Sequence, residues 1–167
     1  MNVRRIVAAT TLCVIMIGLF FAFGCKKDNG EKGDNPPEEP TYPIEIPFEE
    51  YSLEGIHCQW TNLAYDNSVI IINSEEEMSQ YVTCANGGYS EIDFAKYSLI
   101  CASGMATSSP VDVIERQLQQ ISDNEYSLTL IIETGAASKP EPWLVLIKVP
   151  KLFQGAVVTL NVHFPNA

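Results

Sequence analysis

The side chains that could act as acids, bases or nucleophiles in this 167-residue chain are few and scattered. His57 and His163 are its only side chains with an ordinary pKa near neutrality. His57 could pair with Asp93 and a serine in a hydrolase-type triad. The serines that could serve as its nucleophile are Ser103, Ser108 and Ser109. The chain has no G-x-S-x-G elbow, no H-E-x-x-H motif and no phosphate-binding glycine loop. The sequence therefore predicts a noncatalytic protein, with a hydrolase as the alternative.

The N-terminal residues predict that the chain is exported. Arg4 and Arg5 precede an almost unbroken apolar run over residues 6–23, which ends at Gly24-Cys25. A charged region, an apolar region and a small-residue cleavage site are typical of a secretory signal peptide. Ala22-Phe23-Gly24-Cys25 resembles the lipobox of bacterial lipoproteins, which implies removal of residues 1–24 and acylation of Cys25. The alternative is an uncleaved anchor, since about 18 apolar residues can just span a bilayer.

Composition divides the rest of the chain into a tether and one domain. Lys26 follows the lipidation candidate, and its resemblance to known sorting signals implies the outer membrane, with the domain facing the periplasm or the cell exterior. Residues 25–43 are rich in Lys, Asp, Glu, Gly and Pro without apolar periodicity, which predicts a disordered tether. Residues 44–167 suffice for one globular domain with one core. The formal net charge of −11 argues against nucleic acid as a partner.

One helix is predicted near the start of the domain. Ser74-Glu75-Glu76-Glu77 is a capping box, in which the serine accepts from the amide of residue 77 and Glu77 reaches back. Three carboxylates could instead bind a cation, but capping explains them without a ligand. Met78, Tyr81 and Val82 then form one apolar face, so the helix is expected to end near residue 84.

The remaining elements are predicted to be strands. Ile44, Ile46 and Phe48 alternate with polar residues or proline and indicate an edge strand. Residues 111–121 fit either a helix or a bulged strand, and the strong strand that follows favours the strand. Strict alternation recurs over residues 126–132, 143–149 and 158–164, which indicates antiparallel pairing with one wet face. The fold class expected is α+β, with a mostly antiparallel sheet of five to seven strands and one capped helix.

Two of the domain's cysteines are predicted to form a disulfide. Cys101 lies on the apolar face of a predicted strand, where a free thiol behaves as a small hydrophobic side chain. Cys58 lies in a loop-like segment and Cys84 at the expected helix end, and an exported protein can keep a disulfide between them. Three reduced cysteines are the alternative. A metal site is disfavoured because the chain has no C-x-x-C motif. We expect no metal and no cofactor.

Several short motifs follow one another along the domain. They are Cys58-Gln59-Trp60, the run from Ile71 to Met78, Tyr81, Cys84, Ile92-Asp93-Phe94, Tyr97-Ser98-Leu99, Trp143 and Val149-Pro150-Lys151. This succession resembles a group of uncharacterised surface or periplasmic lipoproteins of Bacteroidota-type bacteria. More distantly, it is similar to accessory subunits of the dentilisin-type protease complex. The resemblance implies protein binding and supplies no catalytic residue.

Two segments are candidates for binding a partner. Residues 135–142 join two predicted strands and form a longer connection than a tight hairpin requires. The candidate contacts there are Gly135, Ser138, Lys139, Pro140 and Pro142. Residues 104–110 form the second candidate, with Met105. Ordinary surface loops are the alternative for both segments.

The sequence as a whole predicts a noncatalytic lipoprotein domain, tethered to the membrane, that engages another protein in the periplasm or at the cell surface. An accessory subunit of a secreted protease is one form of this role. A structural envelope or adhesion component is the alternative class.

Overall fold

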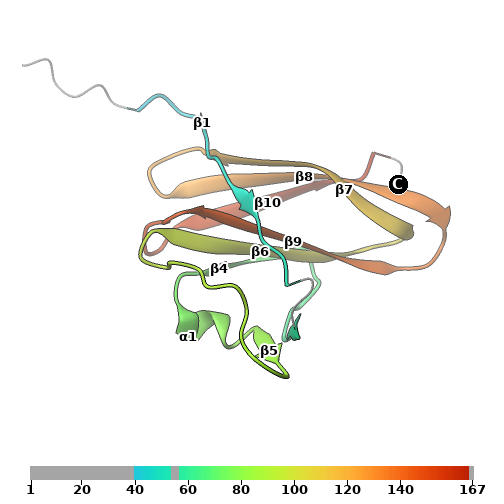
Figure 1. The fold of residues 1–167 in the computed structure, drawn as a ribbon. Coiled ribbons are helices and arrows are strands. Elements are labelled where there is room, and N and C mark those ends of the chain that lie inside the picture. The colour runs from blue at the N-terminus through green and yellow to red at the C-terminus, as the bar shows by residue number, and fades with distance from the viewer. Residues whose placement is uncertain (1–39, 54–56, 166–167) are drawn as a thin grey trace, which may run out of the picture. The chain divides into compact units, whose positions relative to one another are not determined.

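Two four-stranded sheets pack face to face in this computed structural model, which describes residues 40–53 and 57–165 (Figure 1). All of these residues belong to one compact unit. The predicted signal peptide over residues 1–24, the lipidation candidate Cys25 and most of the predicted tether lie outside the described residues. Within the described part, no helix has the length and apolar character needed to cross a membrane.

Four long strands form a two-stranded ribbon that bends in its middle. They are β6 (Tyr97–Ala106), β7 (Ser109–Gln120), β8 (Glu125–Ala137) and β9 (Glu141–Pro150). β6 pairs with β9 and β7 with β8, both antiparallel, and only the links 107–108 and 138–140 separate the two pairings. The bend lays one half of the ribbon over the other, so β7 and β8 enter one sheet and β6 and β9 the other (Figure 1).

Short strands complete the two sheets. The first sheet has the order β1-β7-β8-β10 and the second the order β2-β9-β6-β4. The added strands are β1 (Ile44–Glu45), β2 (Glu49–Glu50), β4 (Ser68–Ile72) and β10 (Val157–His163). β10 runs parallel to β8, whereas its alternation predicted antiparallel pairing. Alternation reports which face of a strand is buried and carries no information on the direction of its neighbour.

A third, smaller layer covers the outer face of the second sheet (Figure 1). It contains the helix α1 (Glu75–Met78) and a two-stranded sheet of β3 (Cys58–Trp60) and β5 (Val82–Cys84). β6 is consequently buried on both faces: Ile100 and Ala102 contribute to the core between the sheets, and Leu99 to the core beneath the third layer. The expected wet face of this sheet is therefore absent at β6.

The serine cap of the predicted capping box is confirmed, but the Glu77 side chain bonds to Asn73 instead of the cap residue, and the helix is much shorter than predicted. The Ser74 hydroxyl accepts from the Glu77 amide at 3.1 Å, and the Glu77 carboxylate accepts from the amide of Asn73 at 2.6 Å. Val82 was expected on the helix face and instead pairs with Trp60 in the small sheet. Strand pairing within the third layer thus overrides the helical pattern after Met78.

The fold class is therefore mostly antiparallel β, and the strand count of five to seven was too low. The described residues contain ten strands, of which several have only two or three residues. Such short strands do not show a period of two in sequence, which is why the count fell short. The bulge expected in residues 111–121 is confirmed by the register shift between Val113 and Glu115.

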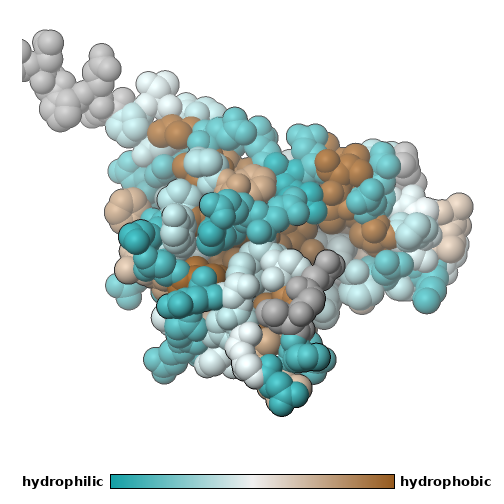
Figure 2. All heavy atoms as spheres, viewed as in Figure 1, coloured by the Kyte–Doolittle hydropathy of each residue, from teal (hydrophilic) through white to brown (hydrophobic). Residues whose placement is uncertain are grey.

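One side of the sandwich is crossed by residues 44–51, which we call the N-terminal strap. Its start pairs with β7, and the Ile46 amide donates to Leu118 O at 2.9 Å. Its end pairs with β9, and the Tyr51 amide donates to Leu146 O at 3.0 Å. Figure 2 views this face, which is mostly hydrophilic where the strap crosses it and has hydrophobic patches beside and beyond it. The strap thus joins the edges of the two sheets.

Candidate functional site

The bend of the ribbon brings the two candidate segments together. Met105 lies opposite Pro142 in the β6–β9 pairing, and Ser109 lies opposite Ala137 in the β7–β8 pairing. Neither segment is the long loop that the sequence suggested, because strand pairing continues to within a few residues of each link. Gly135 belongs to β8 and Pro142 to β9.

Residues 104–110 and 135–142 form a corner at the bend of the ribbon, and the exposed part of this corner is small. Met105 is 45% exposed, and the link residues Ser138, Lys139 and Pro140 are all exposed. Gly135 has a different role, because a Cβ there would overlap Pro110 and the carbonyl oxygen of Ser109. Its lack of a side chain lets β8 approach the start of β7.

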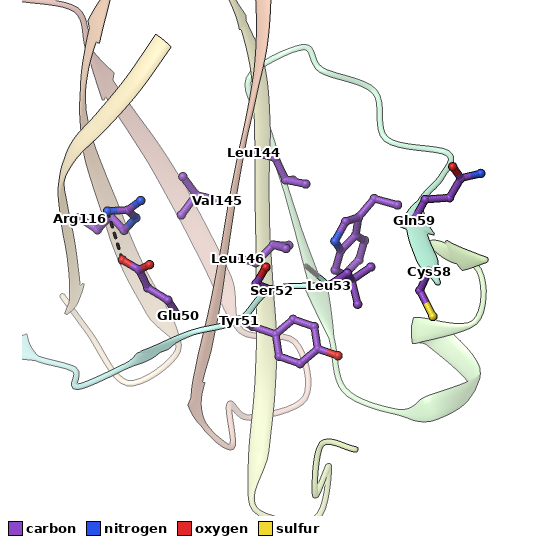
Figure 3. Close-up of a pocket in the computed structure, with 11 residues that line it drawn as sticks. Glu50, Tyr51, Ser52, Leu53, Cys58, Gln59, Arg116, Leu144, Val145 and Leu146 are labelled. Carbon is purple, nitrogen blue, oxygen red and sulfur yellow. Dashed lines mark ion pairs between the residues drawn. The ribbon is translucent and has the colours of Figure 1, made fainter. Parts of the chain in front are cut away.

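A groove with a volume of about 530 Å³ lies along β9 beyond this corner. Figure 3 shows Leu144 and Leu146 on the side of β9 that faces β3, whereas Val145 points to the opposite side, toward Arg116. The groove therefore wraps around the edge of β9. Its lining comes from the end of the strap, β3, β7 and β9: Glu50, Tyr51, Ser52, Leu53, Cys58, Gln59, Trp60, Arg116, Leu144, Val145 and Leu146.

The edge of β9 is free along this groove within the described residues. The strap pairs with β9 only as far as Leu146. In an antiparallel sheet the backbone groups of alternate residues point to the same side of the strand. The C=O of Leu146 points toward the strap, so the N–H and C=O of Leu144, two residues earlier, point to the same side and face the groove. Pro142, the next residue with this orientation, has a carbonyl but no N–H. The open edge thus offers the N–H and C=O of Leu144 and the C=O of Pro142 between the corner and the strap.

Compared with the edge of β9, the neighbouring edge of β7 is protected against the addition of a strand. The Arg116 guanidinium donates to the carbonyl of Val113 at 3.1 Å and forms an ion pair with Glu50 at 3.3 Å (Figure 3). The bulge after Val113 interrupts the regular row of backbone groups on the same strand. Charged side chains and bulges are the usual means of blocking strand addition, so β9 offers the better docking edge.

Trp60 adds an unused donor to the groove lining. Its indole Nε1 is buried and has no hydrogen-bond partner among the described residues. An unpaired buried donor costs about 1–3 kcal/mol, so a ligand acceptor that reached this N–H would gain more than the same contact at an exposed site. Leu53 and Tyr51 supply apolar surface nearby.

Among the described residues, no hydrogen bond or ion pair joins His57, Asp93 and a candidate serine of the hydrolase alternative. His57 lies beside Gln59, Thr83 and Ala85 at the β3–β5 pair. The Asp93 carboxylate instead pairs with Lys96 at 2.7 Å, and this hydrogen-bonded ion pair lowers the pKa of Asp93. In the described part of the chain, no group of three His, Cys, Asp or Glu side chains is placed to hold a metal ion.

The cysteines are arranged as predicted. Cys58 and Cys84 form a disulfide between β3 and β5, where they lie directly opposite each other. Cys101 is a buried free thiol, and burial raises its pKa to about 12. It therefore stays protonated and unreactive near neutral pH.

No family model, curated protein or solved structure matches this chain. The groove itself was not predicted from the sequence, because its lining comes from four separate segments. The tryptophan in Cys58-Gln59-Trp60 was the one available signal, since tryptophan is enriched at protein interfaces.

Proposed function

We propose that this protein is a noncatalytic lipoprotein domain that binds an extended segment of another protein outside the inner membrane. The observation that supports the proposal best is the free edge of β9, which runs from the exposed corner at Pro142 into the groove at Leu146. An extended segment added to a sheet edge gains affinity from backbone hydrogen bonds and specificity from adjacent side-chain pockets. In this arrangement Met105 and Lys139 would contact one end of the segment and Trp60 the other.

An accessory subunit of a secreted protease is a narrower form of the proposal. It rests on the resemblance carried by the helix start at residues 74–77, by Ile92-Asp93-Phe94 and by the later strand that ends in Val149-Pro150. It would make the protease the source of the bound segment. An envelope or adhesion component would use the same edge for a different partner.

Replacing Leu144 with proline tests the docking edge. The substitution removes the backbone N–H that faces the groove, while the bonds between β9 and β6 come from the alternate residues and remain. The matched control is Leu144→Ala, which shortens the same side chain and keeps the N–H. We expect Leu144→Pro to recover at least tenfold less partner than Leu144→Ala when full-length protein is captured from native envelopes and co-purifying proteins are quantified by mass spectrometry. Equal recovery by two folded variants, checked by thermal unfolding, would exclude strand addition at β9.

Lipidation is tested separately at Cys25. In Cys25→Ser the thiol that would be acylated is missing, so we expect complete loss of radiolabelled palmitate incorporation. The control is Cys13→Ser, which changes a cysteine within the apolar run and should keep the label. A Cys25→Ser protein that still incorporated palmitate, or a wild-type protein that retained residues 1–24, would refute the lipoprotein assignment.

A further inference from the structure

β10 is an edge strand with none of the usual protection against strand addition. It lies on the side of the sandwich opposite the strap and has a partner only on its β8 side within the described residues. Its seven residues include no proline and no Asp, Glu, Lys or Arg, and its register with β8 has no shift. Natural edge strands are usually interrupted by charges, prolines or bulges, as the edge of β7 is here by Arg116 and the bulge after Val113.

The core is also incompletely covered along β10. Val158, Leu160 and Val162 face the core but are only partly buried, whereas their β8 neighbours Leu128 and Leu130 are fully buried. On the opposite side of the sandwich the strap adds Ile46 and Phe48 to the core. A further strand beside β10 would cover its apolar side chains in the corresponding way.

The sequence of β10 is close to a palindrome. If two copies pair antiparallel about Leu160, Val158 lies opposite Val162 of the second copy and Thr159 lies opposite Asn161. Apolar core-facing residues then meet apolar residues, and exposed polar residues meet polar residues. The remaining pair is Val157 with His163.

The charge of the protein favours this edge for contact between copies. Each chain has a formal net charge of −11, so most faces of two copies repel each other. β10 places no acidic side chain against another in the antiparallel pairing. The contact uses the same strand in both copies, so it is isologous and closes at two copies.

We propose that this protein forms a dimer in which β10 pairs antiparallel with β10 of a second copy, so that the first sheet continues across the two-fold axis as eight strands. The dimer contact lies at the opposite edge from the groove on β9. Partner binding and dimerisation are therefore separable, and Leu144→Pro should dimerise like the wild type.

Cysteine crosslinking tests the pairing and its register. We expect Thr159→Cys and Asn161→Cys, co-expressed in the full-length protein with different tags, to form a disulfide-linked dimer in native envelopes after mild oxidation. Either variant expressed alone should give at least tenfold less disulfide-linked dimer. In that case the two thiols of the dimer lie diagonally across the strand pair, about 7–8 Å apart, which is too far for a disulfide. The control pair is Ser127→Cys with Thr129→Cys, which has the same spacing on β8 one strand from the edge and should not crosslink. Equal crosslinking by the single variants, or none by the mixed pair, would overturn the proposal.

Paired charges provide an independent test. Thr159 and Asn161 are exposed, so charges at these positions leave the core unchanged. We expect sedimentation of the detergent-solubilised full chain to show a dimer for the wild type, a monomer for Thr159→Glu/Asn161→Glu and a restored dimer for Thr159→Glu/Asn161→Lys. A monomeric wild type at about 100 µM, or a dimer that survives in the double glutamate variant, would contradict the proposed contact, the latter indicating another interface.

Discussion

Replacing Gly135 with alanine is expected to lower the free energy of unfolding by about 3 kcal/mol, at the upper end of the usual cost of overpacking. The added Cβ would overlap the proline ring of Pro110 and the carbonyl oxygen of Ser109. These are a rigid ring and a backbone atom, so relief requires β7 and β8 to separate at the bend of the ribbon. Chemical denaturation followed by tryptophan fluorescence measures the change.

Gly88→Ala is the matched control for this experiment. A Cβ at Gly88 meets no atom within 4 Å, so its stability should stay within about 0.5 kcal/mol of the wild type. Gly104→Ala should resemble Gly135→Ala, because its Cβ would overlap the indole of Trp143. If Gly135→Ala and Gly88→Ala were equally stable, the close approach of the strands at the bend would be wrong.

Removing the disulfide is expected to have a comparable effect. The double variant Cys58→Ala/Cys84→Ala should lose about 3 kcal/mol of stability, because the bond closes a loop with a sequence separation of 26 and restricts the unfolded chain. The double replacement avoids leaving one free thiol. Thermal unfolding with and without a reductant measures the effect.

The same variant supplies the control for reduction. Reductant should destabilise the wild type and leave the double variant unchanged, since the remaining thiol of the domain, Cys101, is already reduced and buried. A wild type that unfolds identically with and without reductant would show that this bond does not form or contributes nothing.

Local sequence signals predicted those parts of the fold that depend on local chemistry. The serine cap at Ser74 and the alternation in β8 and β9 each involve neighbouring residues, and both are present. The helix beyond Met78 and the direction of β10 depend on partners distant in sequence. The period of the sequence does not encode those partners.

The candidate site shows the same division. Both candidate segments were chosen because turn-forming residues interrupt alternating strands there. Their meeting at one corner follows only from the bend of the ribbon. The groove depends on where the strap leaves β9, after Tyr51. No pattern around Leu144 distinguishes a free strand edge from a paired one.

The bent ribbon also sets the order in which contacts can form as the chain folds. Gln120 and Tyr126 are paired and close in sequence, so pairing of β7 with β8 can begin there at a small cost in loop-closure entropy. Tyr97 and Pro150 close a loop that contains the whole of that hairpin, so their pairing is far less local. Since non-local pairings slow folding, the β7–β8 hairpin is expected to be the folding nucleus. Its apolar face stays exposed until the second sheet has formed. A newly synthesised chain would therefore pass through a stage in which this face needs protection from other chains.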